Sequence, residues 1–264
     1  NDTREKNVLN YFEEEKKMYR LADRTICLSR DSYTILRTVY KLDKNKISLI
    51  PNGLRNPKNV SKQIYIEEIR NSLNIRIDEK ILIAIGRPTK QKGIFDLIKA
   101  MKMVIKETNQ NVRLVIIGDA NEQSFRELIN AASPLATSVS FTGLLDRESI
   151  YKWISIADLG IIPSYYEQFG FVGVEMMMYG LPIVASDGLG VRNMFQDGVN
   201  AKIAKIANRQ HPEEYQNNLA NTILALLNSP DTCKVLGSNA RKRYEEKYHT
   251  RFMKQKYNEL IESL

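Results

Sequence analysis

Short β-branched runs that alternate with helical patterns constrain the fold of this chain more than any other feature. From about Ile81 onward the runs read "ILIAIG", "VRLVIIG", "VSFTG", "LGIIPS" and "PIVAS", with helical periodicity between them. The first helical pattern places its apolar residues on one face: Ile94, Leu97, Ile98, Met101, Val104 and Ile105. This rhythm predicts an α/β fold with a Rossmann-like, doubly wound parallel sheet. Ligands of such sheets bind beyond the carboxyl ends of the strands, so a functional site is expected in the loops that follow them.

Composition excludes several classes of protein. The 264 residues are 43% hydrophobic and 27% charged, which is typical of a globular chain long enough to bury a core. The apolar runs are only strand-sized and the first residues do not resemble a signal peptide, so a cytoplasmic chain without a membrane span is expected. Cys27 and Cys233 are far apart, and His211 and His249 belong to no ligand cluster. We therefore expect neither a disulfide framework nor a metal site.

The net charge of +8 suits a phosphate-bearing ligand, an anionic membrane surface or nucleic acid. Basic runs such as "ARKRYEEKYHTRFMKQKY" are interleaved with glutamate, which is typical of a solvated helix face. Nucleic acid is the weakest of the three partners, because the basic residues are dispersed and the aromatic residues follow helical patterns. Peripheral contact with the anionic inner face of the plasma membrane stays open as an alternative.

Residues 1–53 are organised differently from the rest of the chain. They predict a charged helix to about Leu21, a strand "TICLS", a helix with Asp31 or Ser32 as its N-cap, and the segment "KISLIPNGL". Two strands and two helices cannot close a core of their own, so this segment is interpreted as the tail of a preceding domain that ends in a hinge at Pro51 and Gly53. The expected domains are therefore residues 1–53, a nucleotide-binding domain over residues 54–230, and C-terminal helices over residues 231–264.

The first candidate loop is "IGRPTKQKGIFD", residues 85–96, in which a strand end leads through Gly86 and Gly93 into a helix. Arg87 offers a planar fork of donors and Lys92 a movable positive charge, and the helix start adds free amides. These groups could hold a diphosphate without a metal ion. The alternative is a surface connection with solvated lysines, because short glycine and lysine motifs also occur by chance.

The second candidate loop lies in "SYYEQFGFVGVEMMMYG", residues 164–180. Gly170 permits backbone conformations that are closed to other residues, so the amides of Phe171 and Val172 could approach an anion at the start of the helix that follows. Glu175 could accept hydrogen bonds from a vicinal diol, and Glu167 stands in the loop beside the same cavity. Alternatively, the helix dipole alone favours Glu175, Glu167 is an exposed loop residue, and Met176, Met177 and Met178 fill the core.

Taken together and in this order, several segments resemble the C-terminal, donor-binding domain of retaining GT-B glycosyltransferases of family four. They are "GRPTKQKG", "VRLVIIGD", "VSFTGLL", "IADLGIIPSYYEQFGFVGVEMMMYGLPIVASDGLG" and "QDGVNA". The resemblance covers about residues 46–201 and implies a glycosyltransferase with one half of a GT-B fold. It also implies that the end of the acceptor domain precedes the hinge, and that the last helix crosses back onto that domain.

The resemblance implies a role for each candidate residue. Arg87 and Lys92 would grip the donor diphosphate and Glu167 would contact the transferred sugar, so that these three residues would be catalytic. Gly86 and Gly93 would belong to the donor-binding residues. The backbone from Phe169 through Gly170 and Phe171 to Val172 would contact sugar and phosphate, Glu175 the ribose, and Leu144 and Leu145, after Gly143, the base. The donor would be a nucleotide-diphosphate sugar, with UDP favoured over GDP or ADP, and no cofactor or metal ion is expected. The acceptor would be a glycan or a lipid-linked sugar.

Departures from the family pattern leave other functions open. The family often has a Gly-Gly pair and then a glutamate after the strand matching "IVASD", where this chain has Leu189 and Asn193. The body of the acceptor domain is missing as well, so the chain alone is expected to be inactive. A non-catalytic nucleotide-sugar binding module is therefore a second hypothesis. A sugar-nucleotide epimerase is a third, which the absence of histidine from residues 1–210 argues against.

Overall fold

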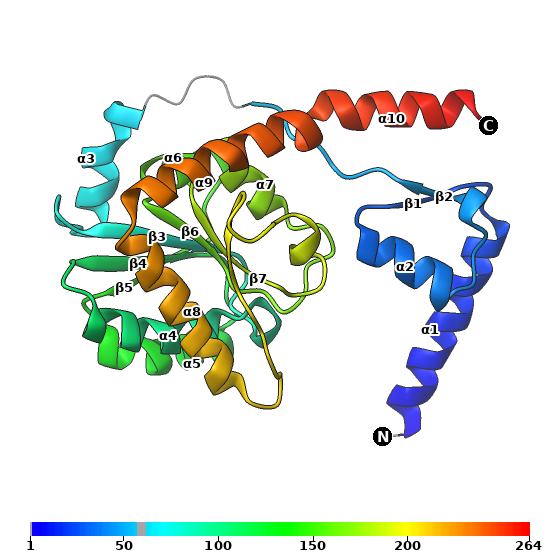
Figure 1. The fold of residues 1–264 in the computed structure, drawn as a ribbon. Helices are drawn as coiled ribbons and strands as arrows, with labels where there is room; N and C mark the ends of the chain where they lie inside the picture. The colour runs from blue at the N-terminus through cyan, green and yellow to red at the C-terminus, as the bar shows by residue number, and fades with distance from the viewer. Residues whose placement is uncertain (1, 57–61) are drawn as a thin grey trace.

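The computed structural model describes residues 2–56 and 62–264, and its largest element is a six-stranded parallel sheet (Figure 1). Its strands are β3 (Lys80–Ile85), β4 (Val112–Ile117), β5 (Val139–Gly143), β6 (Leu159–Ile162), β7 (Ile183–Ser186) and β8 (Lys202–Ala204). They lie in the order β5-β4-β3-β6-β7-β8, and every neighbouring pair is parallel. The predicted doubly wound sheet is confirmed. Only β8 has no counterpart among the predicted strands.

Helices cover both faces of this sheet (Figure 1). One face carries α3 (Lys62–Ser72), α6 (Arg147–Ile156), α7 (Phe171–Met178) and α9 (Pro230–Arg243); the other carries α4 (Ile94–Glu107), α5 (Glu122–Ala132) and α8 (Pro212–Leu227). Alternate residues of β3 enter the two cores: Ile81 and Ile83 on the first face, Leu82 and Ala84 on the second, all fully buried. Burial on both faces explains why these strands read as continuous apolar runs.

The order in which the chain adds strands reverses between β3 and β6. From β3 the chain builds outward through β4 to β5, then returns to the other side of β3 and continues through β6 and β7 to β8. In doubly wound sheets the crevice outside this switch point is the usual ligand site. The two loops that flank it, after β3 and after β6, are the two candidate loops of the sequence.

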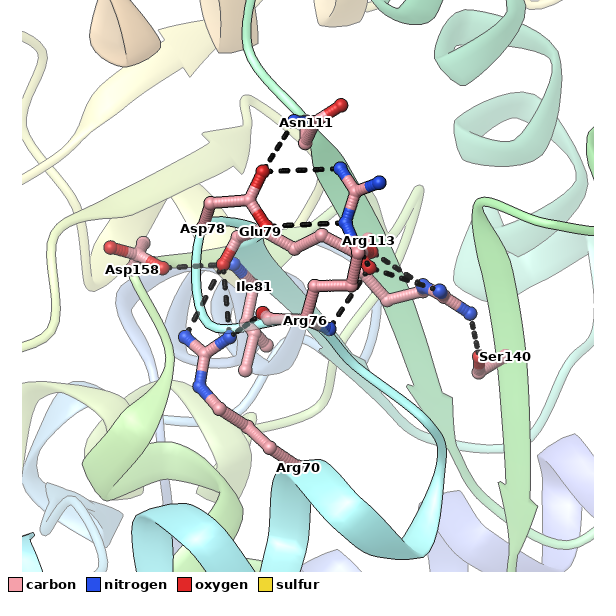
Figure 2. A network of polar contacts seen from close by, with 9 residues as sticks. All are labelled: Arg70, Arg76, Asp78, Glu79, Ile81, Asn111, Arg113, Ser140 and Asp158. Atoms are coloured by element: carbon pink, nitrogen blue, oxygen red, sulfur yellow. Dashed lines mark hydrogen bonds and ion pairs between the residues drawn. The ribbon is translucent and has the colours of Figure 1, made fainter.

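A polar network fixes the opposite end of the sheet (Figure 2). Glu79, just before β3, is 7% exposed, and its carboxylate accepts hydrogen bonds from Arg113 Nε at 2.9 Å and from the Arg76 amide at 3.1 Å. Arg70 of α3 donates to the Glu79 carbonyl at 3.2 Å. Because the Glu79 carboxylate pairs with Arg113 and Arg76, and Arg70 donates to a backbone carbonyl, we interpret the network as an anchor between α3 and β3 and not as a ligand site.

Residues 2–53 form a smaller unit beside the sheet domain (Figure 1). It contains α1 (Asp2–Leu21), β1 (Thr25–Cys27), α2 (Arg30–Thr38), a short 3-10 helix η1 (Lys44–Lys46) and β2 (Ile47–Leu49). β1 and β2 pair in parallel over a small buried cluster that includes Cys27, Leu36, Leu42 and Ile47. The helix ending at Leu21 and both strands were predicted.

The prediction that Asp31 or Ser32 caps α2 is wrong, because Ser29 is the N-cap. Ser29 is extended, with φ −144° and ψ 161°, and its hydroxyl accepts a hydrogen bond from the Ser32 amide at 3.1 Å. The helix therefore begins at Arg30. Asp31 lies in its first turn, where its carboxylate is available for contacts outside the helix.

The C-terminal helices touch the linker between the two units. A π-helical turn (Tyr244–Tyr248) follows α9 and leads to α10 (Thr250–Glu262), which extends toward β1 and β2 (Figure 1). The Leu54 amide donates to the Tyr248 carbonyl at 2.9 Å, and the Thr250 amide donates to the Leu54 carbonyl at 3.0 Å. A Cβ on Gly53 would lie 2.8 Å from the Thr250 Cα, so this linker position needs glycine for close packing. The domain boundaries inferred from the sequence stay predictions.

Within the described residues, none of the helices combines the length and the apolar character that crossing a bilayer requires.

Candidate functional site

The loop after β3 presses against the loop after β6. The short 3-10 helix η2 (Lys90–Lys92) is capped by Thr89, and Gly93 then takes a left-handed conformation, with φ 65°, before α4 begins. A Cβ on Gly93 would lie 2.0 Å from the Pro163 carbonyl oxygen, which follows β6. Glycine is therefore required here both by backbone geometry and by the close approach of the two loops.

The loop after β6 places the carboxylate of Glu167 and the uncapped start of α7 beside the loop after β3. Glu167 donates its amide to the Leu189 carbonyl at 2.9 Å, which ties its backbone to the loop after β7. α7 then begins at Phe171 after Gly170, which is left-handed with φ 80° and supplies no side-chain cap. The first amides of α7 carry the partial positive charge of the helix start.

Lys92 and Glu167 meet between these two loops. The ammonium of Lys92 lies 2.6 Å from Oε1 of Glu167, and Ser164 donates its hydroxyl to the same oxygen at 2.9 Å. The side chains of Lys92 and Glu167 are 27% and 16% exposed, so water competes only partly with the pair. Both residues line a cavity together with Ser164, Gly170 and Val172. The cavity therefore joins a cation, a carboxylate and a helix start at the switch point.

Arg87 lies on the loop of Lys92 but outside this cavity. Its side chain is exposed and makes no hydrogen bond or ion pair with the described residues. Gly86 before it has φ 146° and open space where a Cβ would stand. The guanidinium is thus available for an anion that extends out of the cavity.

Glu175 lies on α7 and is also not among the cavity's lining residues. It lies between α6 and α7, close to the Tyr151 hydroxyl and the Arg147 guanidinium. Burial raises the pKa of Glu175 to about 7, although Arg147 and Tyr151 favour its charged form. The hydroxyl of the neighbouring Tyr179 is buried without a hydrogen-bond partner in the described part of the chain.

The remaining predicted residues lie around the same edge of the sheet. Leu144, after β5, is 76% exposed, while Leu145 packs partly against the core. Phe169 is 6% exposed and stacks edge-on against Phe171 and Tyr248, so it offers a ligand only its backbone. Phe171 itself is half exposed. Among the residues that the structure describes, no three His, Cys, Asp or Glu side chains gather as metal ligands would.

The family model described as glycosyl transferases group 1 matches residues 65–243. The chain belongs to this family of glycosyltransferases.

Relatives in the family are considerably longer than this chain. An uncharacterized glycosyltransferase of Methanocaldococcus jannaschii is 32% identical over 62% of this chain and 42% of its own length. A lipopolysaccharide 1,2-N-acetylglucosaminetransferase of Salmonella typhimurium is 26% identical over 81% of this chain and 59% of its own. The Anabaena protein HepE, solved in complex with UDP-glucose, shares the fold with a TM-score of 0.79, at 24% identity over 93% of this chain and 65% of that one. The chain thus spans less than two thirds of each.

The loop after β7, which carries Leu189 and Asn193, contacts the N-terminal unit. The Asp31 carboxylate accepts hydrogen bonds from the Gly190 amide at 2.8 Å and from the Asn193 amide group at 2.5 Å, and it pairs with the Arg192 guanidinium at 2.6 Å. A glutamate in place of Asn193 would face Asp31 with a like charge. An asparagine at position 193 therefore suits the acid that faces it from residues 2–53.

Sequence reasoning missed two contacts: that of Ser164 with Glu167 in the cavity, and that of Asp31 with the loop after β7. Ser164 is three residues before Glu167, and a hydroxyl at that spacing in a tight loop is a weak signal that could have been read. Asp31 is 159 positions from Gly190, and no local pattern links them.

Proposed function

We propose that this chain is the donor-binding half of a glycosyltransferase that moves a sugar from a nucleotide diphosphate to a glycan or a lipid-linked sugar. The transfer would retain the anomeric configuration and need no metal ion. The observation that carries the proposal is the Lys92–Glu167 pair, which lies at the switch point beside the start of α7. A cation and helix amides suit a diphosphate, and a carboxylate suits sugar hydroxyls.

The proposed role of each residue follows from the charges that develop during sugar transfer. Donor cleavage leaves negative charge on the diphosphate while the anomeric carbon gains oxocarbenium character. Lys92 and Arg87, with the amides of Phe171 and Val172, stabilise the leaving diphosphate. Glu167 orients the transferred sugar, and the acceptor attacks from the face that the diphosphate leaves.

The nucleoside would extend from the diphosphate toward Glu175 and the β5 exit. In this proposal Glu175 accepts hydrogen bonds from the ribose, and Leu144 and Leu145 contact the base. The exposure of Leu144 supports a role in which a ligand covers it. UDP is the proposed nucleotide, supported by the similarity to a protein solved with UDP-glucose.

Calorimetry with UDP, GDP and ADP on this chain tests the donor site. The proposal expects UDP to bind more tightly than GDP or ADP, and the chain alone to transfer no sugar. If none of the three nucleotides binds, the proposal is wrong. A turnover assay on the enzyme with its acceptor domain then tests catalysis.

A non-catalytic nucleotide-sugar binding module is the second proposal, because a cation, a carboxylate and a helix start at one cavity suit binding of a diphosphate sugar whether or not transfer follows. Under that alternative, the complete protein binds a nucleotide sugar but neither hydrolyses nor transfers it.

A cytoplasmic location with peripheral contact to an anionic leaflet is part of the same proposal. The net charge of +8 supports it, as does similarity to a lipopolysaccharide transferase. The complete protein should sediment with anionic liposomes at low salt, and failure to do so would remove membrane contact from the proposal.

A further inference from the structure

A second concavity lies beside the Lys92–Glu167 cavity and shares no lining residue with it. We call it the tyrosine groove, and its walls include Lys90, Lys99, Asp96, Tyr165, Tyr166 and Arg209. Its volume of about 680 Å³ falls within the range of roughly 300–1,000 Å³ that is typical of small-molecule sites. None of the roles assigned above to the donor uses it.

The groove is built on the same two loops as the donor cavity. The Tyr165 amide donates to the Gln91 carbonyl at 2.9 Å, which joins the loop after β6 directly to η2. Lys90 and Gln91 precede Lys92, and Tyr165 and Tyr166 precede Glu167. A molecule in the groove is therefore adjacent to the place where the proposed transfer occurs.

Its charge is positive and largely uncompensated. Lys90 and Lys99 are exposed and make no ion pair with the residues that the structure describes. Asp96, the acid in the walls, is engaged internally: Tyr165 donates to its Oδ2 at 3.0 Å and Gln216 to its Oδ1 at 2.8 Å. The groove thus has three positively charged side chains, those of Lys90, Lys99 and Arg209, and one carboxylate that is already hydrogen-bonded within the chain. This excess of positive charge favours an anionic ligand.

Its aromatic walls are fixed and partly open. The Tyr165 ring packs edge-on against the buried Tyr215 ring at 5.3 Å, and the Arg209 guanidinium lies over it at 5.8 Å from the ring centroid. Arg209 also donates to the Tyr165 carbonyl at 3.3 Å, so its charge is held in place. Tyr166 is 39% exposed. An aromatic face next to a cation that is held in place suits the apolar face of a sugar that also carries a negative group.

We propose that the tyrosine groove binds an anionic sugar unit, one that carries a carboxylate or a phosphate, on the acceptor side of the reaction. This inference rests on the proposed function for its link to transfer, but its binding chemistry stands on the groove alone. Lys99 and Arg209 pair with the anionic group, and Tyr166 packs against the sugar ring.

Nuclear magnetic resonance titration of this chain tests the proposal with four probes in parallel: tetragalacturonic acid, glucose 6-phosphate, neutral maltotetraose and UDP. At least one anionic probe should shift the amide signals of residues 165, 166 and 209, and maltotetraose should not. The two anionic probes separate carboxylate from phosphate recognition. Affinity should fall as salt is raised, because exposed charges are screened.

Two variants and one control locate the binding. Lys99→Ala and Tyr166→Ala should each lower the affinity for the anionic probe at least about fivefold, because each removes one charge-assisted or aromatic contact. Lys106→Ala, on the exposed last turn of α4, removes a lysine charge outside the groove and should leave the affinity for the anionic probe unchanged. All three variants should keep wild-type affinity for UDP.

Three results would overturn the groove assignment. Neither anionic probe binds the chain, Lys99→Ala and Tyr166→Ala bind the anionic probe as tightly as the wild type, or UDP displaces the bound anionic probe. Failure of UDP to bind, with the anionic probe still bound at residues 165, 166 and 209, would instead refute the donor-site proposal and leave the groove standing.

Discussion

The Lys92 ammonium and the Glu167 carboxylate lie 2.6 Å apart although 75 positions separate them in the chain. They meet because β3 and β6 are neighbours in the sheet and both strands end at the switch point. Pairing leaves two donors of the Lys92 ammonium for other partners. It also offsets the charge of Glu167, which would otherwise repel an anion in the same cavity.

Close contact between the two loops predicts a large stability loss for Gly93→Ala. The added Cβ would lie 2.0 Å from the Pro163 carbonyl oxygen, at a residue with φ 65°. The conformation alone costs about 1–2 kcal/mol, and moving the backbone of the facing loop should bring the loss in free energy of unfolding above about 3 kcal/mol. Urea denaturation measures it.

Gly198→Ala is the matched control for this substitution. Gly198 has a similar φ of 69°, but a Cβ added there would meet no atom within 4 Å, so only the conformational cost of about 1–2 kcal/mol applies. Equal losses for the two variants would show that the loops do not press together as described.

Contact between the N-terminal unit and the loop after β7 predicts energetic coupling between Asp31 and Arg192. Asp31 is only 17% exposed at its side chain. Partial burial opposes its ionisation, but hydrogen bonds from Arg192, Gly190 and Asn193 hold the pKa of Asp31 below its ordinary value. A double-mutant cycle with Asp31→Ala and Arg192→Ala should give a coupling of about 1–3 kcal/mol in urea unfolding at pH 7.

The sign of the pKa shift also sets the pH range of this coupling. It should be fully present above the unfolded-state pKa of Asp31 and be lost as the pH falls through the lower folded-state value. The pair Lys234 and Asp231, which is 79% and 97% exposed, is the control and should couple by less than about 0.5 kcal/mol. Coupling as weak for Asp31 and Arg192 would contradict the contact.

Much of the fold could be predicted because its signals are local. β3, β4 and β6 are buried on both faces and therefore read as β-branched runs, whereas β8 is a three-residue strand with no such run. The N-cap of α2 was misassigned because Ser29, Asp31 and Ser32 are all good capping residues, and only backbone geometry selects Ser29.

The site could be predicted only as separate loops. Local motifs selected Lys92 and Glu167, but their contact depends on which strands are neighbours, as does the contact of Asp31 with Gly190. The positions of Arg87 and Glu175 outside the cavity likewise follow from packing that residue type and spacing do not determine.

The burial of Glu175 predicts a pH-dependent contribution to stability. Because its folded-state pKa is raised to about 7, the folded protein holds this proton more tightly than the unfolded chain does. That contribution is complete below the unfolded-state pKa of about 4.3 and is lost as the pH rises through 7. Glu175→Gln removes it while keeping the shape of the side chain.

Urea unfolding from pH 5 to pH 8 measures this effect. The wild type should lose stability relative to Glu175→Gln across that range, by about 3 kcal/mol at most. Parallel curves for the two proteins would mean that Glu175 titrates normally.

The most direct test of the donor site is calorimetry of UDP binding to the wild-type chain, Lys92→Ala and the charge-matched control Lys106→Ala. Lys92→Ala removes a charge-assisted contact to the diphosphate and should lower the affinity for UDP about 10- to 100-fold. Lys106→Ala should bind UDP as tightly as the wild type. Equal UDP affinity in all three proteins would contradict a diphosphate site built around Lys92 and Glu167.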